Sequence, residues 1–332
     1  MSADEGAALS SALEDALSSA LGVRVSVQGL RRLSGGSSRE NWWFELAGHG
    51  QTRPMLLRRD PVTSVANTER AVERTVLDAL VHEPLPTPVI VAADLDGGRL
   101  ERPWMVLECN SGRADRSVLR DRDPFRLGPA GRLGIAHDLC DLLADAHRLD
   151  PATTGLGVVP VDPARNEIDR WSDEWSRVAR QPQPELAYAA MWLDEHRPPP
   201  PQRPVLVHGD FRPANVLIDD DDGTGRVSVL LDWEFAHLGD PAEDVGWYLA
   251  PIYRTEHLLG DQWTATMFLE RYCARSGITI EPERLRFWQV LATFKLAVIA
   301  LAAVSSFLDD SGDRAAPPTD GVMRTLMREV RS

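Results

Sequence analysis

The segment between Val205 and Asp232 constrains the fold of this chain more than any other. Short apolar runs alternate there with a loop and with a turn rich in Gly and Asp, and the expected strands are Val205–Val207, Val216–Asp219 and Val227–Leu231. The last two strands would pair as a hairpin, which places Asn215 roughly opposite Asp232 at the open end. Asp210 reaches the same end from the preceding strand. We therefore expect three oxygen-bearing side chains to converge at one rim.

These three side chains have the chemistry of a phosphoryl-transfer site. Mg²⁺ prefers hard oxygen ligands, which the Asp232 carboxylate and the Asn215 amide oxygen supply. Asp210 remains to accept the proton of an attacking hydroxyl, as in a kinase-type site. The alternative is a polar hairpin whose carboxylates stay solvated, and any one of these residues alone would favour it. The complete His-Gly-Asp-x₄-Asn…Leu-Asp pattern favours catalysis.

The composition is that of a globular protein with room for two lobes. The 332 residues are 43% hydrophobic and 26% charged, and the formal net charge of −14 disfavours general nucleic-acid binding. The three cysteines lie far apart and indicate neither a zinc site nor a disulfide framework. The acidic N-terminus lacks an apolar signal core, and the apolar run Leu296–Val304 is too short to span a bilayer. We expect a cytoplasmic protein without a membrane partner, in which this run is a buried helix.

Hydrophobic periodicity predicts a sheet-rich front and a helical remainder. The front should contain a helix over 7–21, strands over 23–33, 42–46, 55–59, 89–94 and 104–107, and an internal helix over 67–80. Helices should predominate from residue 127, over 127–149, around 171–175, and over 186–196, 258–276, 281–304 and 321–330. This gives an N-terminal nucleotide-binding lobe over 1–107, a hinge over 108–112 and a C-terminal catalytic lobe over 113–332.

The front lobe contains a candidate phosphate-covering loop. Residues 34–41 are glycine-rich and join two expected strands. Glycine lets backbone N–H groups approach phosphate oxygens closely, although the same residues also suit a plain hairpin turn. Together with the downstream motif, the loop is interpreted as cofactor-binding through Gly35, Gly36, Ser37 and Ser38.

The third expected strand should carry a cation for the nucleotide phosphates, normally a lysine paired with a helix glutamate. The only lysine, Lys295, lies elsewhere, whereas Arg58 ends this strand and Glu73 lies in the following helix. Arginine is always charged and can grip a phosphate with two N–H groups. We interpret Arg58 and Glu73 as a functional pair, and the neighbouring Arg59 as a solvated surface charge.

Further candidates lie in the hinge and around the catalytic loop. Glu108 and Asn110 belong to the hinge, whose backbone N–H and C=O groups would bind the purine edge of a nucleotide. His208 should pack and hydrogen-bond within the loop. Arg212 should either steady the transferring phosphoryl group or form a local ion pair.

The residues after the hairpin have a local structural explanation. Asp240 suits a helix N-cap, with Pro241 at the first helical position and Glu243 at the capping-box position. Asp240 and Asp244 should therefore be structural first and support the catalytic loop. Most of the aromatic residues should be core. Trp247 and Tyr248 are the candidates for an acceptor pocket because they follow the metal-binding segment closely.

Taken together, these motifs resemble the aminoglycoside phosphotransferase and choline kinase-like branch of the protein-kinase-like fold. The resemblance implies an α+β, two-lobed protein and the ATP- or GTP-dependent transfer of a γ-phosphoryl group to a small-molecule hydroxyl. It implies that Asp210 is the base, that Asn215 and Asp232 hold Mg²⁺, and that Arg58 steadies the α- and β-phosphates, oriented by Glu73. Arg58 departs from the usual lysine, as in relatives of the acyl-CoA-dehydrogenase-associated type. These relatives suggest hydroxyacyl thioesters as an alternative to an aminoglycoside-like antibiotic or hydroxylated metabolite.

Two other functions remain open from the sequence. A nucleotide-binding pseudokinase is supported by the missing strand lysine, but the residues of the acidic motif are all present. A hydrolase using the same acidic cluster ranks last, because the ligands of a second metal are missing. Neither the acceptor nor the choice between ATP and GTP follows from these residues.

Overall fold

The computed structural model describes residues 3–33, 40–48, 50–60, 68–220, 223–309 and 319–331. The chain forms two compact units, one of Met1–Gly112 with Ser228–Phe235 and the other of Arg113–Val227 with Ala236–Ser332. The return of residues 228–235 to the first unit has no counterpart in the sequence-based division, which assigns all residues after 112 to one lobe. As a result, Asp232 belongs to the first unit and Asp210 to the second.

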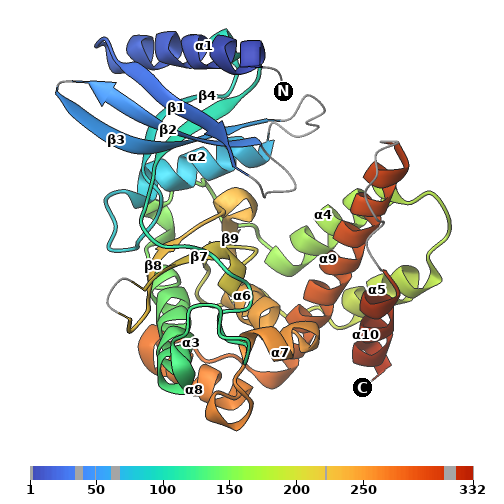
Figure 1. The fold of residues 1–332 in the computed structure, drawn as a ribbon. Helices are drawn as coiled ribbons and strands as arrows, with labels where there is room; N and C mark the ends of the chain where they lie inside the picture. The colour runs from blue at the N-terminus through green and yellow to red at the C-terminus, as the bar shows by residue number, and fades with distance from the viewer. Residues whose placement is uncertain are drawn as a thin grey trace. The chain divides into compact units, whose positions relative to one another are not determined.

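The first unit is built on a five-stranded antiparallel sheet with the order β1-β2-β3-β5-β4. Its strands are β1 (Ser26–Arg32), β2 (Glu40–Gly48), β3 (Gln51–Arg59), β4 (Ile90–Asp94) and β5 (Trp104–Glu108). Helix α1 (Ala3–Leu21) lies along one face of the sheet, and α2 (Thr68–Leu80) lies on the other side (Figure 1).

Strand alternation gives the two faces of this sheet different roles, because successive side chains point to opposite sides. The α1 face is an apolar core whose members include Leu13, Leu17, Trp42, Phe44, Met55 and Leu57. At the end of β3, Arg59 pairs in register with Glu40, and Arg58 pairs with Asn41. The side chains of Arg58 and Arg59 therefore lie on opposite faces of the sheet.

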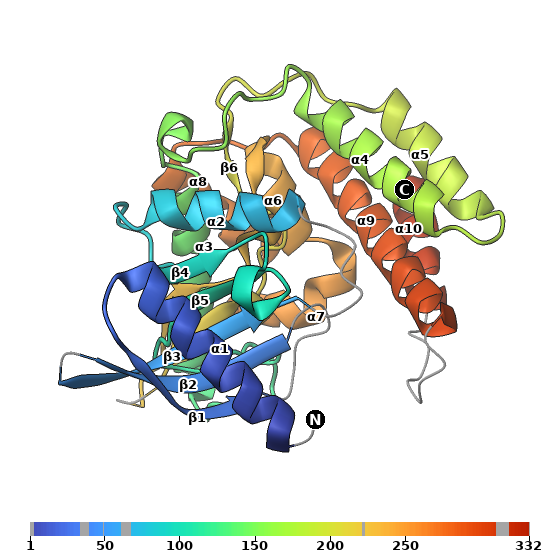
Figure 2. The ribbon, with the colours of Figure 1, turned by 90° about the horizontal axis from the view of Figure 1, so that it is seen from above.

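The second unit is mainly helical. Its helices are α3 (Gly128–Ala146), α4 (Pro163–Val178), α5 (Pro184–Glu195), α6 (Pro241–Tyr248), α7 (Arg254–His257), α8 (Ala265–Ser276), α9 (Pro282–Asp309) and α10 (Asp320–Arg331). Figure 2 shows α4, α5, α9 and α10 side by side, in agreement with their contacts. The expected hairpin is present as β7 (Val216–Asp219) paired with β8 (Arg226–Leu230).

Helix α9 is the central helix of the second unit and packs against α4, α5, α6 and α10. By length and composition its stretch Pro282–Ser305 could cross a membrane, but 56% of its most apolar window is buried within the protein. The expected buried helix is therefore present, and it is longer than the apolar run that predicted it.

Two elements differ from the expectation. The helix expected over 258–276 begins only at Ala265, because the Thr264 side chain caps it by accepting from Met267 N at 3.2 Å and a 3₁₀ turn over Gly260–Gln262 precedes it. Strand β9 (His237–Gly239) was not expected; it pairs with β6 (Val205–Val207). Three residues carry too little periodicity to reveal a strand.

Candidate active site

An aspartate of α6 holds the backbone of the loop that carries Asp210. Asp244 Oδ2 accepts a hydrogen bond from His208 N at 2.7 Å, and Oδ1 accepts one from Gly209 N at 2.9 Å. Oδ2 also lies 3.1 Å from Nε2 of His147. Burial opposes ionisation of Asp244, but the hydrogen bonds from His147 and His208 outweigh it and lower the pKa below the ordinary value. The loop is therefore anchored on a buried carboxylate.

Asp210 and Asn215 form one hydrogen-bonded unit. The Asn215 amide donates to both the Asp210 carbonyl oxygen and Asp210 Oδ2, each at 2.8 Å. Arg212 Nη2 lies 3.1 Å from the same Oδ2. Burial raises the pKa of Asp210 above that of an ordinary aspartate, although Arg212 and Lys295 oppose the shift. The carboxylate is fixed in orientation and has become a stronger base, as a general base near neutrality requires.

Lys295 of α9 is a functional candidate that the sequence analysis did not assign. Its Nζ donates to the carbonyl oxygen of Gly209, the residue before Asp210. The ammonium also lies 5.1 Å from the ring centroid of Trp171 and 4.6 Å from that of Trp247, within cation–π range. One signal pointed to it: the chain contains one lysine and 35 arginines. A single lysine in a chain so rich in arginine indicates a position where an arginine side chain does not fit.

Glu167 and Glu243 line the same small cavity as Lys295, and His237 lies beside both glutamates. Potential ligand atoms of Glu167, His237 and Glu243 lie within 4.8 Å of one another. Burial raises the pKa of Glu243, whereas for Glu167 the effect of burial is outweighed by His237, Arg170 and Lys295, which lower its pKa. The protein's own cations therefore already compensate these carboxylates, and we assign the cluster an electrostatic role.

In the first unit, Arg58 joins the candidate metal ligand to the α2 glutamate. Arg58 Nη1 lies 2.5 Å from Glu73 Oε1, and Nη2 lies 3.1 Å from Asp232 Oδ1. Burial opposes the charge of Arg58, but Glu73, Asp232 and Glu234 outweigh it and raise the pKa above the ordinary value. Asp232 has a φ of +66°, a strained left-handed conformation for a non-glycine residue. Strain of this kind is common at functional sites.

The backbone N–H groups at the start of the hinge are already used by the sheet. Glu108 N donates to Val89 O at 2.9 Å, and Cys109 N donates to Pro54 O at 3.2 Å, so these two N–H groups serve the sheet. Asn110 Nδ2 donates to Glu108 O at 3.4 Å. Nucleotide binding by this hinge stays a prediction. The candidates Gly35, Gly36, Ser37 and Ser38 lie outside the described residues.

His208 and Asp240 hold the backbone of the loop and of α6 in place. His208 Nδ1 accepts a hydrogen bond from Asp210 N at 3.2 Å, which stiffens the loop. Asp240 caps α6 by accepting from Ala242 N at 2.9 Å, and it pairs with Arg284. Glu243 does not follow the capping-box expectation, because its carboxylate lies 3.0 Å from His237 Nε2.

The two aromatic candidates differ in their surroundings. Trp247 contacts the Lys295 ammonium and lines a small cavity that Gly209 also borders. Tyr248 is fully buried and donates its hydroxyl to His257 O at 3.0 Å, with its ring stacked on Phe268. The geometry supports a packing role for Tyr248, whereas Trp247 is adjacent to the catalytic loop.

Arg59 contradicts one expectation. Its side chain is only 12% exposed, and its Nη2 lies 2.8 Å from Glu40 Oε2. Arg59 is therefore not a solvated surface charge. The register of β2 with β3 places the two residues opposite each other, which strand periodicity alone did not reveal.

The structure thus forms two clusters, each within one unit. The second unit brings Asp210 and Asn215 together, and the first brings Arg58, Glu73 and Asp232 together. The joint placement of Asp210, Asn215 and Asp232 around one cation stays a prediction.

Comparison with known proteins places the chain among phosphotransferases. The family model of the phosphotransferase enzyme family, APH, matches residues 29–288. Acyl-CoA dehydrogenase family member 10 of Mus musculus is 24% identical over 96% of this chain, which spans only 30% of that relative's length. Aminoglycoside 3'-phosphotransferase of Streptomyces fradiae is 25% identical over 76% of this chain and 90% of its own length.

A solved structure shows the fold. A Ralstonia eutropha protein, crystallised as a candidate aminoglycoside phosphotransferase, matches with a TM-score of 0.72 at 22% identity and covers 97% of this chain and 98% of its own. The expected α+β, protein-kinase-like fold class is confirmed. The matched family also agrees with the expected enzyme class, a phosphotransferase. The family model covers most of the sequence, and the chain belongs to the phosphotransferase enzyme family.

Proposed function

We propose that the chain transfers the γ-phosphoryl group of ATP or GTP to a hydroxyl of a small molecule, with Asp210 as the base. The environment of Asp210 is the observation that carries this proposal. Its carboxylate is oriented by Asn215 and Arg212, and the backbone beside it is held by Asp244 and Lys295. A carboxylate used only for solubility would not be buried and fixed in this way.

In the proposed reaction, Asp210 accepts the proton of the acceptor hydroxyl as the hydroxyl oxygen attacks the γ-phosphorus. The bond from the γ-phosphorus to the β–γ bridging oxygen breaks, and a nucleoside diphosphate leaves. A raised pKa makes Asp210 a better proton acceptor than an ordinary aspartate. Arg212 is 31% exposed beside the same carboxylate and is suited to steady the transferring group.

The residues predicted to bind the nucleotide keep their roles in this proposal. Arg58, oriented by Glu73, would contact the α- and β-phosphates, and the loop with Gly35, Gly36, Ser37 and Ser38 would cover them. The oxygen donors of Asn215 and Asp232 fit Mg²⁺, which when bound would neutralise the charge of the phosphates. Glu108 and Asn110 would border the purine ring of the nucleotide.

The acceptor is proposed as a hydroxylated small molecule. The Streptomyces relative supports an aminoglycoside-like acceptor, and the acyl-CoA dehydrogenase relatives support a hydroxyacyl thioester. Trp247 is the aromatic residue that we place beside the acceptor. No nucleic-acid or membrane partner is proposed, and a cytoplasmic location stays a prediction.

Transfer of labelled phosphate tests the proposal. The full chain is incubated with Mg²⁺ and γ-labelled ATP or GTP and with aminoglycosides, macrolides, sugars, amino alcohols and hydroxyacyl thioesters. We expect label in at least one acceptor with the wild type and its loss with Asp210→Ala. Nucleotide binding without transfer to any acceptor would instead support a pseudokinase, the alternative that the missing strand lysine suggests from the sequence alone. Equal transfer by wild type and Asp210→Ala would remove the assigned base.

A further inference from the structure

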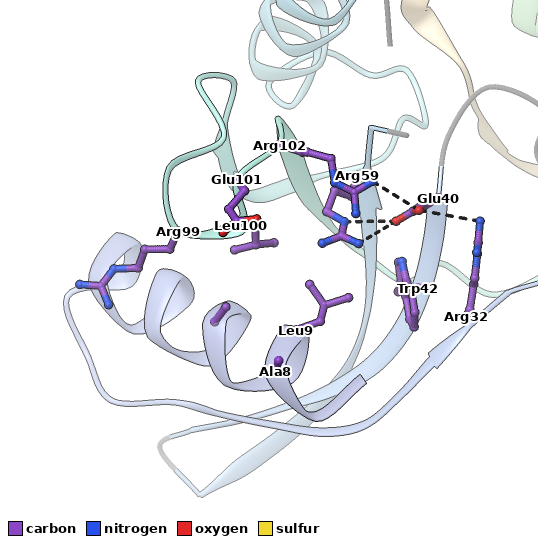
Figure 3. A pocket seen from close by; sticks show the side chains of 11 residues that line it. Ala8, Leu9, Arg32, Glu40, Trp42, Arg59, Arg99, Leu100, Glu101 and Arg102 are labelled. Atoms are coloured by element: carbon purple, nitrogen blue, oxygen red, sulfur yellow. Dashed lines mark hydrogen bonds and ion pairs between the residues drawn. The ribbon is translucent and has the colours of Figure 1, made fainter. Parts of the chain in front are cut away.

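An arginine-lined cavity lies in the first unit, on the α1 face of its sheet. The cavity has a volume of about 520 Å³ and is bordered by α1, by the 3₁₀ turn Gly98–Leu100 and by the ends of β1, β2 and β3 (Figure 3). Pockets of about 300–1,000 Å³ are typical of small-molecule sites. The charged residues that line it are Arg32, Arg59, Arg99, Arg102, Glu40 and Glu101. Four guanidinium groups and two carboxylates leave the lining with a positive formal charge in a chain whose net charge is −14.

The Glu40 carboxylate lies within 4 Å of the guanidinium groups of three of these arginines. Arg59 donates to Glu40 Oε2 from Nη2 at 2.8 Å and from Nε at 3.2 Å. Arg102 Nη1 lies 3.4 Å and Arg32 Nη2 lies 3.9 Å from Glu40 Oε1. Figure 3 shows the Glu40 carboxylate between Arg32 and Arg59, with Arg99 at the opposite end of the cavity. Arg102 Nη1 also donates to the Asp60 carbonyl oxygen at 2.7 Å. Since each guanidinium carries five N–H donors, these two acceptor groups cannot satisfy all the donors of the three arginines.

An indole N–H in the cavity wall points to the same conclusion. Trp42 lines the cavity and is 2% exposed, and its buried Nε1 has no hydrogen-bond partner among the described residues. Five other buried indole N–H groups of the described residues are also unpaired, so the Trp42 N–H supports the cavity only through its place in the cavity wall. In Figure 3 the nitrogen edge of the indole is directed toward Glu40 and Arg59. The remaining wall is apolar and includes Leu9 and Leu100. The cavity thus combines a cationic end with a surface for an organic body.

We propose that this cavity binds a small organic phosphate monoester. Such a group carries a charge of about −1.5 to −2 at pH 7, which suits a lining in which guanidinium groups outnumber carboxylates. Arg99 is paired with Asp15 at 3.4 Å, so Arg32, Arg59 and Arg102 are the arginines proposed for the phosphate. Arginine forks suit phosphate oxygens because two N–H groups can donate in parallel. The site differs from the proposed nucleotide site, since Arg58 faces Glu73 and the adjacent Arg59 faces Glu40. No residue that lines it belongs to the proposed catalytic machinery.

Calorimetric titration of the full chain with phenyl phosphate tests this proposal. Arg32→Gln and Arg102→Gln should each weaken binding by about tenfold, the loss expected for one charge-assisted hydrogen bond. Arg31→Gln is the matched control, because Arg31 neighbours Arg32, lies over Trp43 and does not line the cavity. It should leave the dissociation constant within about twofold. Ala12→Trp, which fills the cavity from α1 and keeps every charge, should abolish binding.

Three results would overturn the proposal. The first is no detectable binding of phenyl phosphate by the folded wild type at millimolar concentration. The second is an equal loss for Arg31→Gln and Arg32→Gln, which would show general electrostatic attraction. The third is unchanged binding by Ala12→Trp with a circular dichroism spectrum and melting curve like those of the wild type. None of these results bears on phosphoryl transfer, which is measured separately.

Discussion

Replacing Lys295 with methionine removes a buried ammonium group and keeps a side chain of similar length. In the structure the group donates to the Gly209 carbonyl and lies over the rings of Trp171 and Trp247. A hydrogen bond to a charged group contributes about 1.5–3 kcal/mol, and its loss leaves a carbonyl without that donor. We expect the free energy of unfolding to fall by about 3 kcal/mol, since removing one partner of a buried charged network costs about 3–5 kcal/mol.

Protonation of a neighbour should limit this loss. Lys295 helps to compensate Glu167 and Glu243, and burial already raises the pKa of Glu243. Without the ammonium, we expect that pKa to rise further, which favours the protonated form of Glu243. The double variant Lys295→Met/Glu243→Gln should therefore lose less stability than the sum of the single variants, by about 1–3 kcal/mol of coupling.

Lys295→Arg separates charge from shape. The cavity beside the ammonium, bordered by Glu167, Trp171, Gly209 and Trp247, has a volume of only about 10 Å³. A planar guanidinium therefore does not fit without moving the loop, and we expect Lys295→Arg to remain destabilised although its charge is retained. This would explain why the only lysine of the chain stands here.

Urea denaturation followed by tryptophan fluorescence measures the stabilities, and labelled-phosphate transfer measures kcat. Lys295→Met should lower kcat because the Gly209–Asp210 backbone loses one anchor, while KM for nucleotide changes little. The reasoning is refuted if the free energy of unfolding of Lys295→Met lies within about 0.5 kcal/mol of the wild-type value, the range of an ordinary surface substitution, and kcat is unchanged. Full stability of Lys295→Arg would refute the argument from shape.

Further predictions concern the two clusters. Asp210→Asn should lower kcat by about 100- to 10,000-fold, with nucleotide affinity by calorimetry unchanged, because a general base contributes about this much. The acid limb of kcat/KM should show an apparent pKa above the 3.8 of an ordinary aspartate, since burial raises that of Asp210, and a lower value measured in a pH–rate profile would contradict the assignment. Asp244→Asn should lower the free energy of unfolding by about 2 kcal/mol at pH 7. Because the pKa of Asp244 is lowered in the folded state, the stability difference between variant and wild type should shrink as the pH falls below about 4. Urea denaturation curves measured at acid pH would show this. Arg58→Gln should raise KM for nucleotide about tenfold and leave KM for the acceptor unchanged in steady-state kinetics, and equal changes in both would contradict its phosphate role.

The hydrogen-bonded loop that carries Asp210 could be predicted from the sequence because its information is local. Asp210 and Asn215 are five residues apart, and the strands on either side are marked by short apolar runs, so their contact follows from one loop and one turn. The pairing of Arg58 with Glu73 was predicted in the same way, from a strand and the helix after it. Each of these contacts spans few residues, so the chain leaves few alternatives.

Contacts made over long sequence separations could not be predicted. Lys295 lies 86 residues from Gly209, and Asp232 lies 174 residues from Arg58. Neither contact leaves a periodic signal, because each depends on how whole elements pack. Arg59 was misassigned for a related reason: its partner Glu40 is set by the register of two strands, and register is fixed only when the sheet forms.

The position of Arg58 bears directly on the choice between an active enzyme and a pseudokinase. A missing strand lysine argues for inactivity only if no other cation stands in its place. Here a guanidinium reaches Glu73 with one nitrogen and Asp232 with another, a bridge that its fork geometry permits and that also ties the two residues together. Its raised pKa keeps it charged at any physiological pH, whereas burial would tend to discharge a lysine ammonium. Because Arg58 engages Asp232 through Oδ1, the second carboxylate oxygen is the atom that would meet a cation. The substitution thus preserves the charge that phosphoryl transfer requires, and activity is the expectation that follows.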